Sequence, residues 1–220
     1  MNSINTKTVD EGQAVYSNKV LSIYDLWVLG ISNSFIWKCS TKLLRSEFFE
    51  FATENHLDVG VGTGYYLEKC LIYEKCRIGL IDLNANSLQA AASRIHQRKP
   101  EIYQANVLDK LNLVCDRFDS ISMNYLLHCL PGTIKEKSVV FDNLIPYLNK
   151  NGVVFGSTLL GTGIEKSGMA SWLMAFYNRK GIFHNSQDSL DDLTSALNNH
   201  FTKVEVKVVG CAAVFSGQLG

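Results

Sequence analysis

A glycine-rich turn between a short apolar segment and a helical pattern constrains the fold more than any other feature of this chain. His56-Leu57-Asp58-Val59 is followed by Gly60, Gly62 and Gly64, and then by Tyr65-Tyr66-Leu67. Alternating glycines at the end of a strand allow a sharp turn and let the backbone approach a ligand closely. The spacing G-x-G-x-G differs from the dinucleotide fingerprint G-x-G-x-x-G, and no Lys-Ser/Thr of a P-loop follows it. Taken alone, the turn could also be an ordinary connection between a strand and a helix.

From residue 50 onward, short β-rich runs alternate with helical patterns. The runs predict strands over residues 55–59, 77–81, 101–105, 118–123 and 153–158, and helices over residues 65–71, 85–97, 134–148 and 189–198. Residues 149–152, Asn-Lys-Asn-Gly, are typical of the end of a helix. Two further β runs at 203–209 and 212–215, separated by two residues, predict an antiparallel hairpin. This alternation predicts an α/β fold with a mostly parallel sheet and helices on both faces.

Two segments outside this alternation are rich in aromatic residues. Residues 1–49 are expected to form a helical N-terminal cap over the ligand edge of the sheet, and residues 50–220 the catalytic domain, as a single globular unit. Residues 161–185 are long for a connection in such a sheet. They are therefore expected to form a lid over the acceptor.

The charges and cysteines bound the class of protein. Lys and Arg number 21, Asp and Glu also number 21, and the formal net charge is zero. A balanced chain has no overall field that would attract a polyanion, so nucleic acid is not expected as a partner. No apolar run reaches the ~18–20 residues of a membrane span, and no signal peptide is recognised at the polar N-terminus. The six cysteines include no C-x-x-C, so we expect free thiols, no metal site and a cytoplasmic protein.

A second signal follows the glycine turn. The predicted strand Ile78-Gly79-Leu80-Ile81 ends in Asp82. A carboxylate at this position can accept hydrogen bonds from both hydroxyls of a ribose, as in nucleotide-binding α/β sheets. The alternative is an Asp that caps the next helix or lies on the surface. The pairing with the glycine turn favours the ribose.

Together, the segment Asp58 to Gly64, Asp82, the stretch Asn106-Val107-Leu108-Asp109 and the terminal hairpin resemble the class I S-adenosylmethionine-dependent methyltransferases, over roughly residues 50–216. The resemblance implies a Rossmann-like, doubly wound, seven-stranded sheet with an antiparallel C-terminal hairpin. It also implies S-adenosylmethionine as cofactor and S-adenosylhomocysteine as product. The aromatic N-terminal segment with Tyr24-Asp25 is similar to that of small-molecule methyltransferases of the quinone-biosynthesis group.

The resemblance also implies roles for individual residues. Asp58 would help to hold the methionyl amino group, through water or backbone, and Asp82 would bind the ribose. Asn106 and Val107 would lie at the adenine, although the family most often has Asp at the position of Asn106. Asn124 would bind near the methionyl carboxylate or position the substrate. The cofactor site is completed by Gly60, Gly62, Gly64, Leu83 and Tyr24.

The acceptor site is less determined. His128 could remove a proton from the acceptor, since an unperturbed imidazole titrates near neutral pH, or it could be a packed histidine at the start of a helix. Aromatic side chains suit a flat apolar acceptor or a neighbouring sulfonium, but each could also be part of the core. The candidates are Tyr16, Trp27, Trp37, Tyr125, Trp172 and Phe176.

These features predict transfer of a methyl group to the oxygen or nitrogen of a small, rather apolar aromatic or heteroaromatic acceptor. One alternative is a cofactor-binding protein of the same fold with a regulatory or non-methylating role. Another is a protein or nucleic-acid methyltransferase, which the absence of an appended basic domain disfavours. A nicotinamide-dependent dehydrogenase is disfavoured by the glycine spacing. A monomer and a homodimer both remain open.

Overall fold

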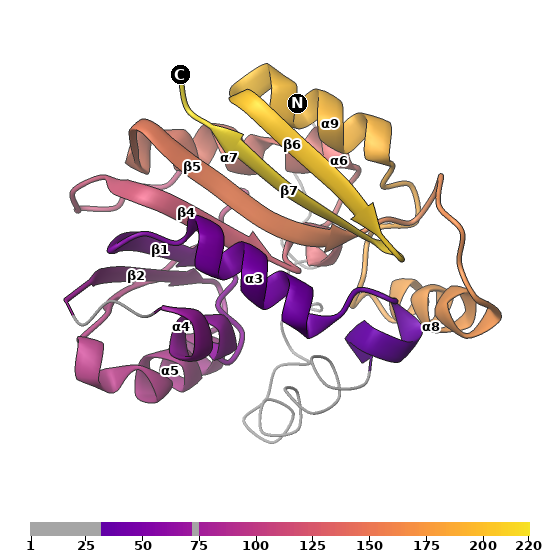
Figure 1. Cartoon of the computed structure of the whole chain (residues 1–220), viewed down its shortest axis with the longest axis horizontal. Helices are drawn as coiled ribbons and strands as arrows, with labels where there is room; N and C mark the ends of the chain where they lie inside the picture. Colours follow the sequence, from indigo (N-terminus) through magenta and orange to yellow (C-terminus); the bar gives the residue numbers. More distant parts are fainter. Residues whose placement is uncertain (1–31, 72–74) are drawn as a thin grey trace.

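The computed structural model describes residues 32–71 and 75–220, which form a seven-stranded sheet with helices on both faces (Figure 1). The strand order is β3-β2-β1-β4-β5-β7-β6. The strands are β1 (Asn55–Val59), β2 (Arg77–Asp82), β3 (Glu101–Gln104), β4 (Phe118–Asn124), β5 (Leu148–Leu159), β6 (Thr202–Val209) and β7 (Ala212–Gln218). The strands β1 to β5 run parallel to one another, whereas β7 pairs antiparallel with both β5 and β6. The predicted fold class is confirmed.

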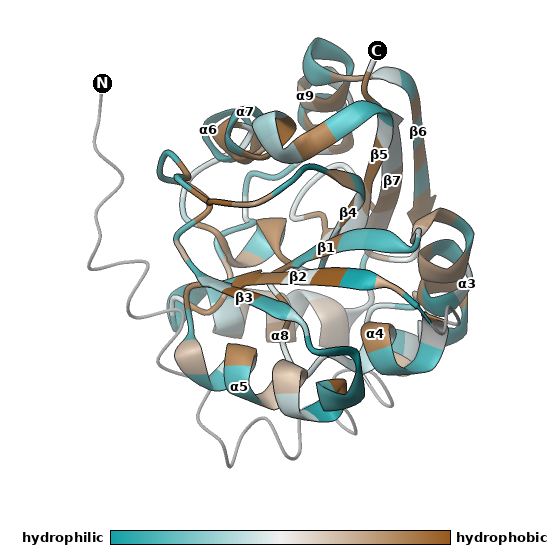
Figure 2. Ribbon diagram, turned by 90° about the vertical axis from the view of Figure 1, so that its left-hand side faces the viewer, coloured by the Kyte–Doolittle hydropathy of each residue, from teal (hydrophilic) through white to brown (hydrophobic). Residues whose placement is uncertain are grey.

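Two groups of helices cover the sheet. On one face lie α3 (Thr41–Phe51), α4 (Tyr65–Cys70) and α5 (Ala85–Arg94), and on the other α6 (Ile134–Lys137), α7 (Val139–Leu144) and α9 (Leu190–His200) (Figure 2). The helix α8 (Gly168–Arg179) lies on the side of the sheet where β5 and β6 end and β7 begins (Figure 1). Short 3₁₀ turns are η2 (His96–Arg98), η3 (Leu127–Cys129) and η4 (Ile145–Tyr147). Among the described helices, none is long and apolar enough to cross a membrane.

The helix α5 shows how the sequence determines such an element. The Asn84 side chain caps its first turn by accepting from the backbone N–H of Asn86 and Ser87. Its inner face buries Leu88 and Ala91 against the sheet. Burial of a leucine side chain contributes about 1.5–3 kcal/mol, so this face holds the helix in place. The N-terminus of α5 thereby lies beside the end of β2.

The centre of the sheet is where the site must form. The strand order reverses between β1 and β4, because the chain moves outward from β1 through β2 to β3 and then returns to β4. Connections leave the two central strands in opposite directions, and a crevice opens at their carboxyl ends. The two strands themselves are buried on both faces. The crevice therefore has a rigid floor.

The predicted helix over 134–148 and the strand over 153–158 are wrong in their bounds. Instead of one helix, the chain forms α6, α7 and the 3₁₀ turn η4. Pro146 lies in that turn, and proline lacks the N–H that would continue an α-helix. The strand β5 already begins at Leu148, so the expected helix-stop residues 149–152 lie within it. Within this part of β5, Asn151 has a left-handed backbone conformation with a φ of 62°.

The predicted N-terminal cap is only partly within the described residues. Its boundary at residues 49 and 50 falls inside α3, which begins after the N-cap Ser40. The helix packs on the sheet through Phe48, whose ring lies 5.5 Å from that of Phe155 on β5 and 5.7 Å from that of Tyr66. Residues 1–31 lie outside the description. The division into a cap and a catalytic domain stays a prediction.

Candidate active site

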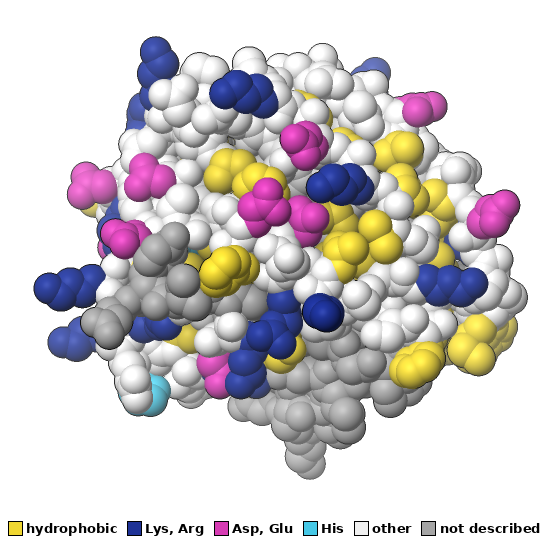
Figure 3. All heavy atoms as spheres, viewed as in Figure 1, with side chains coloured by type: hydrophobic (Ala, Val, Ile, Leu, Met, Phe, Trp, Pro, Cys, Tyr) yellow, Lys and Arg dark blue, Asp and Glu magenta, His cyan; other side chains and the backbone are white. Residues whose placement is uncertain are grey.

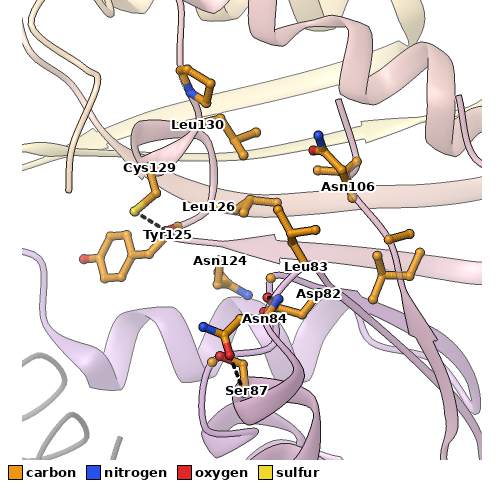
Figure 4. Close-up of a pocket in the computed structure, with 16 residues that line it drawn as sticks. Asp82, Leu83, Asn84, Ser87, Asn106, Asn124, Tyr125, Leu126, Cys129 and Leu130 are labelled. Carbon is orange, nitrogen blue, oxygen red and sulfur yellow. Dashed lines mark hydrogen bonds between the residues drawn. The ribbon is translucent and has the colours of Figure 1, made fainter. Parts of the chain in front are cut away.

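A pocket opens at the carboxyl ends of β1, β2 and β4 (Figure 4). It lies where the reversal of strand order places a crevice. Its lining contains eight of the residues proposed from the sequence: Gly60, Gly62, Asp82, Leu83, Asn106, Val107, Asn124 and Tyr125. Segments that are distant in the sequence therefore meet in a single site.

The three glycines of the turn have different structural roles. All three have positive φ angles, which are 71° at Gly60, 52° at Gly62 and 73° at Gly64. A Cβ on Gly60 would lie 2.8 Å from the side chain of Leu126, and one on Gly64 would lie 2.9 Å from the backbone of Ala91. A Cβ on Gly62 would meet nothing within 4 Å. Gly60 and Gly64 are thus required by packing, whereas Gly62 presents open space at the pocket.

Asp82 ends β2 at the edge of the pocket, as the ribose assignment requires. One carboxylate oxygen accepts from the backbone N–H of Asn84 at 2.8 Å. Burial raises the pKa of Asp82 to about 6, although backbone N–H groups of Asn84, Gly62 and Val61 act to lower it. These bonds hold the carboxylate against the glycine turn. The Asp82 side chain can therefore accept ligand hydroxyls with little loss of conformational entropy.

Asp58 lies behind the pocket lining rather than in it. It precedes the turn on β1, is 7% exposed and accepts a hydrogen bond from the Ser122 hydroxyl of β4. Burial raises its pKa to about 7, the bond from Ser122 opposes this rise, and the charge of Asp82 adds to it. Contact with an amino group through backbone or water fits this position. A nearby ammonium would favour the charged carboxylate.

Asn124 carries a donor that the described part of the protein leaves without a partner. Its Oδ1 accepts from the Ser157 hydroxyl at 3.1 Å, whereas its Nδ2 is buried without a hydrogen bond. The side chain points into the pocket (Figure 4). An unpaired buried donor costs about 1–3 kcal/mol. A ligand carboxylate would relieve this cost, which supports Asn124 as a cofactor ligand.

Asn106 is largely engaged within its own loop. Its Oδ1 accepts from the Leu108 N–H at 3.1 Å, and its Nδ2 donates to Asp109 at 3.0 Å. An amide side chain still offers a second N–H and a second lone pair. The departure from the family's usual Asp therefore leaves one donor for an adenine contact. Val107, beside it, is buried at the pocket wall.

His128 is placed in the interior and not in the pocket lining. It is 3% exposed, and its Nδ1 accepts from the Leu159 N–H at 3.4 Å. The ring meets Phe183 edge-on at a centroid distance of 4.6 Å. Burial, with Lys137 adding to it, lowers the pKa of His128 to about 3. This geometry supports the packed-histidine interpretation over that of a base.

The aromatic candidates do not converge on one place. Trp37 is packed in the core at 3% exposure, 6.1 Å from the ring of Phe183. Tyr125 lines the pocket at a positive φ of 56°, and its ring points away from Asp82 (Figure 4). On α8, Trp172 is 66% exposed and stacks on Phe176 at 5.8 Å. The remaining candidates, Tyr16, Tyr24 and Trp27, lie outside the described residues.

The predicted lid, residues 161–185, contains α8 and is anchored at both ends. Asn185 donates to the Leu159 carbonyl at 2.9 Å, and Gly161 donates to the Asp188 carbonyl at 2.9 Å. The Asp188 carboxylate forms a buried ion pair with Lys137 of α6 at 2.6 Å. Movement of this segment would therefore be confined to α8 and its flanking loops. Closure of the lid stays a prediction.

Sequence reasoning missed part of the lining. The missed residues are Ile81, Asn84, Ser87 and Ala105. Leu126, Cys129, Leu130 and Pro131 belong to the stretch after β4 that the family resemblance places at the methyl donor and the acceptor, although none of the four is a named candidate. Asn84 and Ser87 had a sequence signal, because they begin a helix directly after Asp82. The apolar group from Leu126 to Pro131 had only its position after β4. Among the described residues, no cluster of His, Cys, Asp or Glu could hold a metal ion.

The chain is similar to known methyltransferases. A family model described as a methyltransferase domain matches residues 57–154. Demethylluteothin O-methyltransferase of Streptomyces thioluteus is 38% identical over 94% of this chain and 90% of its own length. The N-methyltransferase VrtF of Penicillium aethiopicum is 38% identical over 81% of this chain and 76% of its own length. A solved DhpI–SAH complex has the same fold, with a TM-score of 0.68 at 14% identity over 98% of both chains.

The chain belongs to the class I S-adenosylmethionine-dependent methyltransferases. It is an enzyme that uses S-adenosylmethionine, and the residues present fit this cofactor. The open space at Gly62 can accommodate the cofactor against the backbone. The buried amide of Asn124 lacks a partner that a carboxylate would supply.

Proposed function

We propose that this enzyme methylates the oxygen or nitrogen of a small, rather apolar aromatic or heteroaromatic acceptor. The observation that carries the proposal is the wall of the pocket formed by Leu126, Cys129, Leu130 and Pro131 beside the polar cofactor residues. A site of this kind fixes orientation through a few polar groups and binds the rest of the ligand by apolar contact. Relatives whose names specify O- and N-methylation support both acceptor atoms.

The acceptor atom that we propose is nucleophilic without a protein base. Among the described lining residues, none is a histidine, lysine or glutamate, and Asp82 is held by backbone N–H groups. A phenolic or enolic hydroxyl loses its proton far more readily than an aliphatic one, and a pyridine-type heteroaromatic nitrogen has a lone pair outside the π system. Such acceptors need positioning more than proton transfer. Orientation alone can account for several kcal/mol of the barrier.

The chain's own residues would perform this positioning. Gly60 to Gly64 and Asp82 would hold the ribose and the methionyl portion, with Asn124 on the methionyl carboxylate. The cofactor supplies a sulfonium with an activated methyl group. Leu126 to Pro131 would place the acceptor atom in line with the methyl carbon and keep water away.

Incubation with S-adenosylmethionine and a panel of acceptors tests the proposal. The panel contains a phenol, an enolic pyrone, an imidazole and an aliphatic alcohol of equal size. The imidazole accepts the methyl group on its pyridine-type nitrogen and then releases the proton of its N–H. We expect S-adenosylhomocysteine release and a product heavier by one CH₂ for at least one aromatic compound, and none for the alcohol. Turnover of the alcohol alone would contradict the proposal. Methylation of a peptide or an oligonucleotide, with no turnover of any compound in the panel, would also contradict it.

The surface supports a small-molecule acceptor over a nucleic acid. Figure 3 shows Lys and Arg interspersed with Asp and Glu on the face that it presents, without a continuous basic track. Specific nucleic-acid binding generally uses a clustered basic surface. A cytoplasmic location stays a prediction of the sequence.

A further inference from the structure

A chain of buried polar side chains runs from the far end of β1 to Asp58. On the parallel strands β1 and β4, His56 lies opposite Ser120, and Asp58 opposite Ser122. The imidazole bridges the two serines, with Nδ1 at 2.8 Å from the Ser120 hydroxyl and Nε2 at 3.0 Å from the Ser122 hydroxyl. The Ser122 hydroxyl in turn donates to Asp58. His56, Ser120 and Ser122 are all 0% exposed.

The donors and acceptors in this row of polar side chains can be assigned so that every hydrogen bond runs in the same direction. Because Ser122 donates to the Asp58 carboxylate, its oxygen must accept from Nε2–H of His56. A neutral imidazole that carries its proton on Nε2 accepts at Nδ1, so Ser120 donates there. The Ser120 oxygen then accepts from the backbone N–H of Thr53 at 2.9 Å. Every bond thus points toward Asp58, and bonds aligned in this way strengthen one another.

The surroundings keep the imidazole neutral. Phe48 of α3 and Phe155 of β5 pack against the ring at centroid distances of 5.2 and 5.8 Å. Burial among these rings lowers the pKa of His56 to about 3. Among the described residues, the charged group that acts on Asp58 is Asp82 of β2, which disfavours the ionised form. The Ser122 donation counteracts both this repulsion and the burial of Asp58.

We propose that His56, acting through Ser122, is a positioning residue that keeps the Asp58 carboxylate ionised and oriented for the amino group of the cofactor. The inference rests on the proposed assignment of Asp58 to that amino group. It explains why a histidine and two serines occupy interior positions of central strands, where apolar residues would pack as well. An ammonium is held by a carboxylate but not by a carboxylic acid. The relay therefore determines the pH range in which the cofactor binds.

The test is the affinity for S-adenosylhomocysteine between about pH 5.5 and 8.5, measured by titration calorimetry. In the wild type, the affinity should increase as the pH rises and Asp58 loses its proton. Ser122→Ala removes the hydrogen bond to Asp58, and His56→Leu removes the hydrogen bond that orients Ser122. Each variant should move the midpoint of the pH dependence of affinity upward by roughly one pH unit. His56→Gln is the matched control, because its Nε2 amide can still donate to Ser122. It should keep a midpoint near that of the wild type.

Several outcomes separate the relay from a structural role. Ser122→Ala and His56→Leu variants that lose affinity by the same factor at every pH, without a shifted midpoint, would overturn the relay. If His56→Leu does not fold, the comparison of the midpoints of Ser122→Ala and His56→Gln tests the relay. Asp58→Asn should bind weakly and lose the part of the pH dependence near pH 7, where Asp58 titrates, while the titration of Asp82 near pH 6 remains. Wild-type binding by Asp58→Asn at every pH would overturn the cofactor assignment, and with it the relay.

A direct measurement reads the tautomer of His56. Nuclear magnetic resonance on ¹⁵N-histidine protein should show a neutral ring protonated on Nε2 throughout this pH range. A ring protonated on Nδ1, or one that titrates within the range, would contradict the assigned direction of the hydrogen bonds.

Discussion

Within the glycine turn, some glycines are needed for packing and another is free to contact a ligand. Gly60 and Gly64 are each confined by a neighbour within 3 Å of a would-be Cβ, so substitution there would disturb the fold and the site together. Gly62 has the same left-handed backbone but faces open space at the pocket. Gly62 is therefore the position at which cofactor contact can be tested with the least effect on packing.

We expect Gly62→Val to lower the affinity for S-adenosylhomocysteine by at least tenfold, since the new side chain occupies space that the cofactor needs. The positive φ adds a cost of roughly 1–2 kcal/mol in stability. Gly181→Val is a matched control, because Gly181 has a φ of 68° and also nothing within 4 Å of its Cβ position. The control should lose similar stability but keep its affinity in titration calorimetry. Equal affinities in both variants would show that the turn is only structural.

His128 is expected to contribute stability, not turnover. His128→Ala leaves the Leu159 N–H without its acceptor and removes the contact with Phe183. We expect a loss of about 2–4 kcal/mol at pH 7 in urea unfolding, with kcat retained at saturating substrate. A fall in kcat of about 100-fold with an unchanged cofactor affinity would instead identify a base.

The pH dependence of this loss has a definite sign. The folded protein holds the pKa of His128 at about 3, against 6.5 for an ordinary histidine, so between these values the unfolded chain binds more protons. Wild-type stability contributed by this group therefore falls as pH falls, by about 1.4 kcal/mol per pH unit. The alanine variant lacks this effect. Its stability deficit should narrow by that amount for each unit below pH 6.5.

Among the elements, α8 presents apolar surface that the fold does not use. Met169 and Trp172 are both more than 60% exposed, and Trp172 stacks on Phe176. The helix lies in the predicted lid, whose ends are anchored to α6 and β5. An anchored segment with exposed aromatic residues suits contact with a flat acceptor.

Trp172→Ala should raise the KM for the acceptor by about fivefold, since one aromatic contact contributes roughly 1 kcal/mol. The melting temperature should change little because the side chain is exposed. Phe49→Ala, at a 56% exposed position of α3, is the control and should leave the KM unchanged. Similar KM values for Trp172→Ala and the wild type would exclude this face from acceptor binding.

For the whole molecule, the order of the strands places the glycine turn, Asp82 and Asn124 at one edge. A ligand that bridges three central strands binds only the folded chain and must stabilise it. At 100 times its Kd, S-adenosylhomocysteine should add about 2.7 kcal/mol. For a chain of this size, this corresponds to a rise in melting temperature of roughly 5–10 °C by calorimetry. NAD at the same concentration should give none, and a rise with NAD alone would contradict the cofactor.

Local patterns predicted most of the sheet correctly. Strand alternation and the terminal hairpin depend on neighbouring residues, and apart from the start of β5 the strands formed within three residues of the predicted bounds. The prediction of a helix over 134–148 rests on a helical pattern and on the helix-stop signal at residues 149–152. A helical pattern of apolar residues does not show that Pro146 ends the α-helical hydrogen bonding. It also does not show that residues 149–152 form hydrogen bonds with β7 and the C-terminal segment.

By itself, the sequence determined the order of the elements and the motif that we assign to the cofactor, because glycine geometry and a carboxylate at a strand end are local properties. Only the tertiary structure decided what depends on distant residues. It packed His128 against Phe183, and it placed His56-x-Asp58 opposite Ser120-x-Ser122 through the pairing of β1 with β4. Burial and strand register arise from contacts between segments far apart in the chain. No local pattern encodes these contacts, and they determine which polar side chains serve the site and which serve the core.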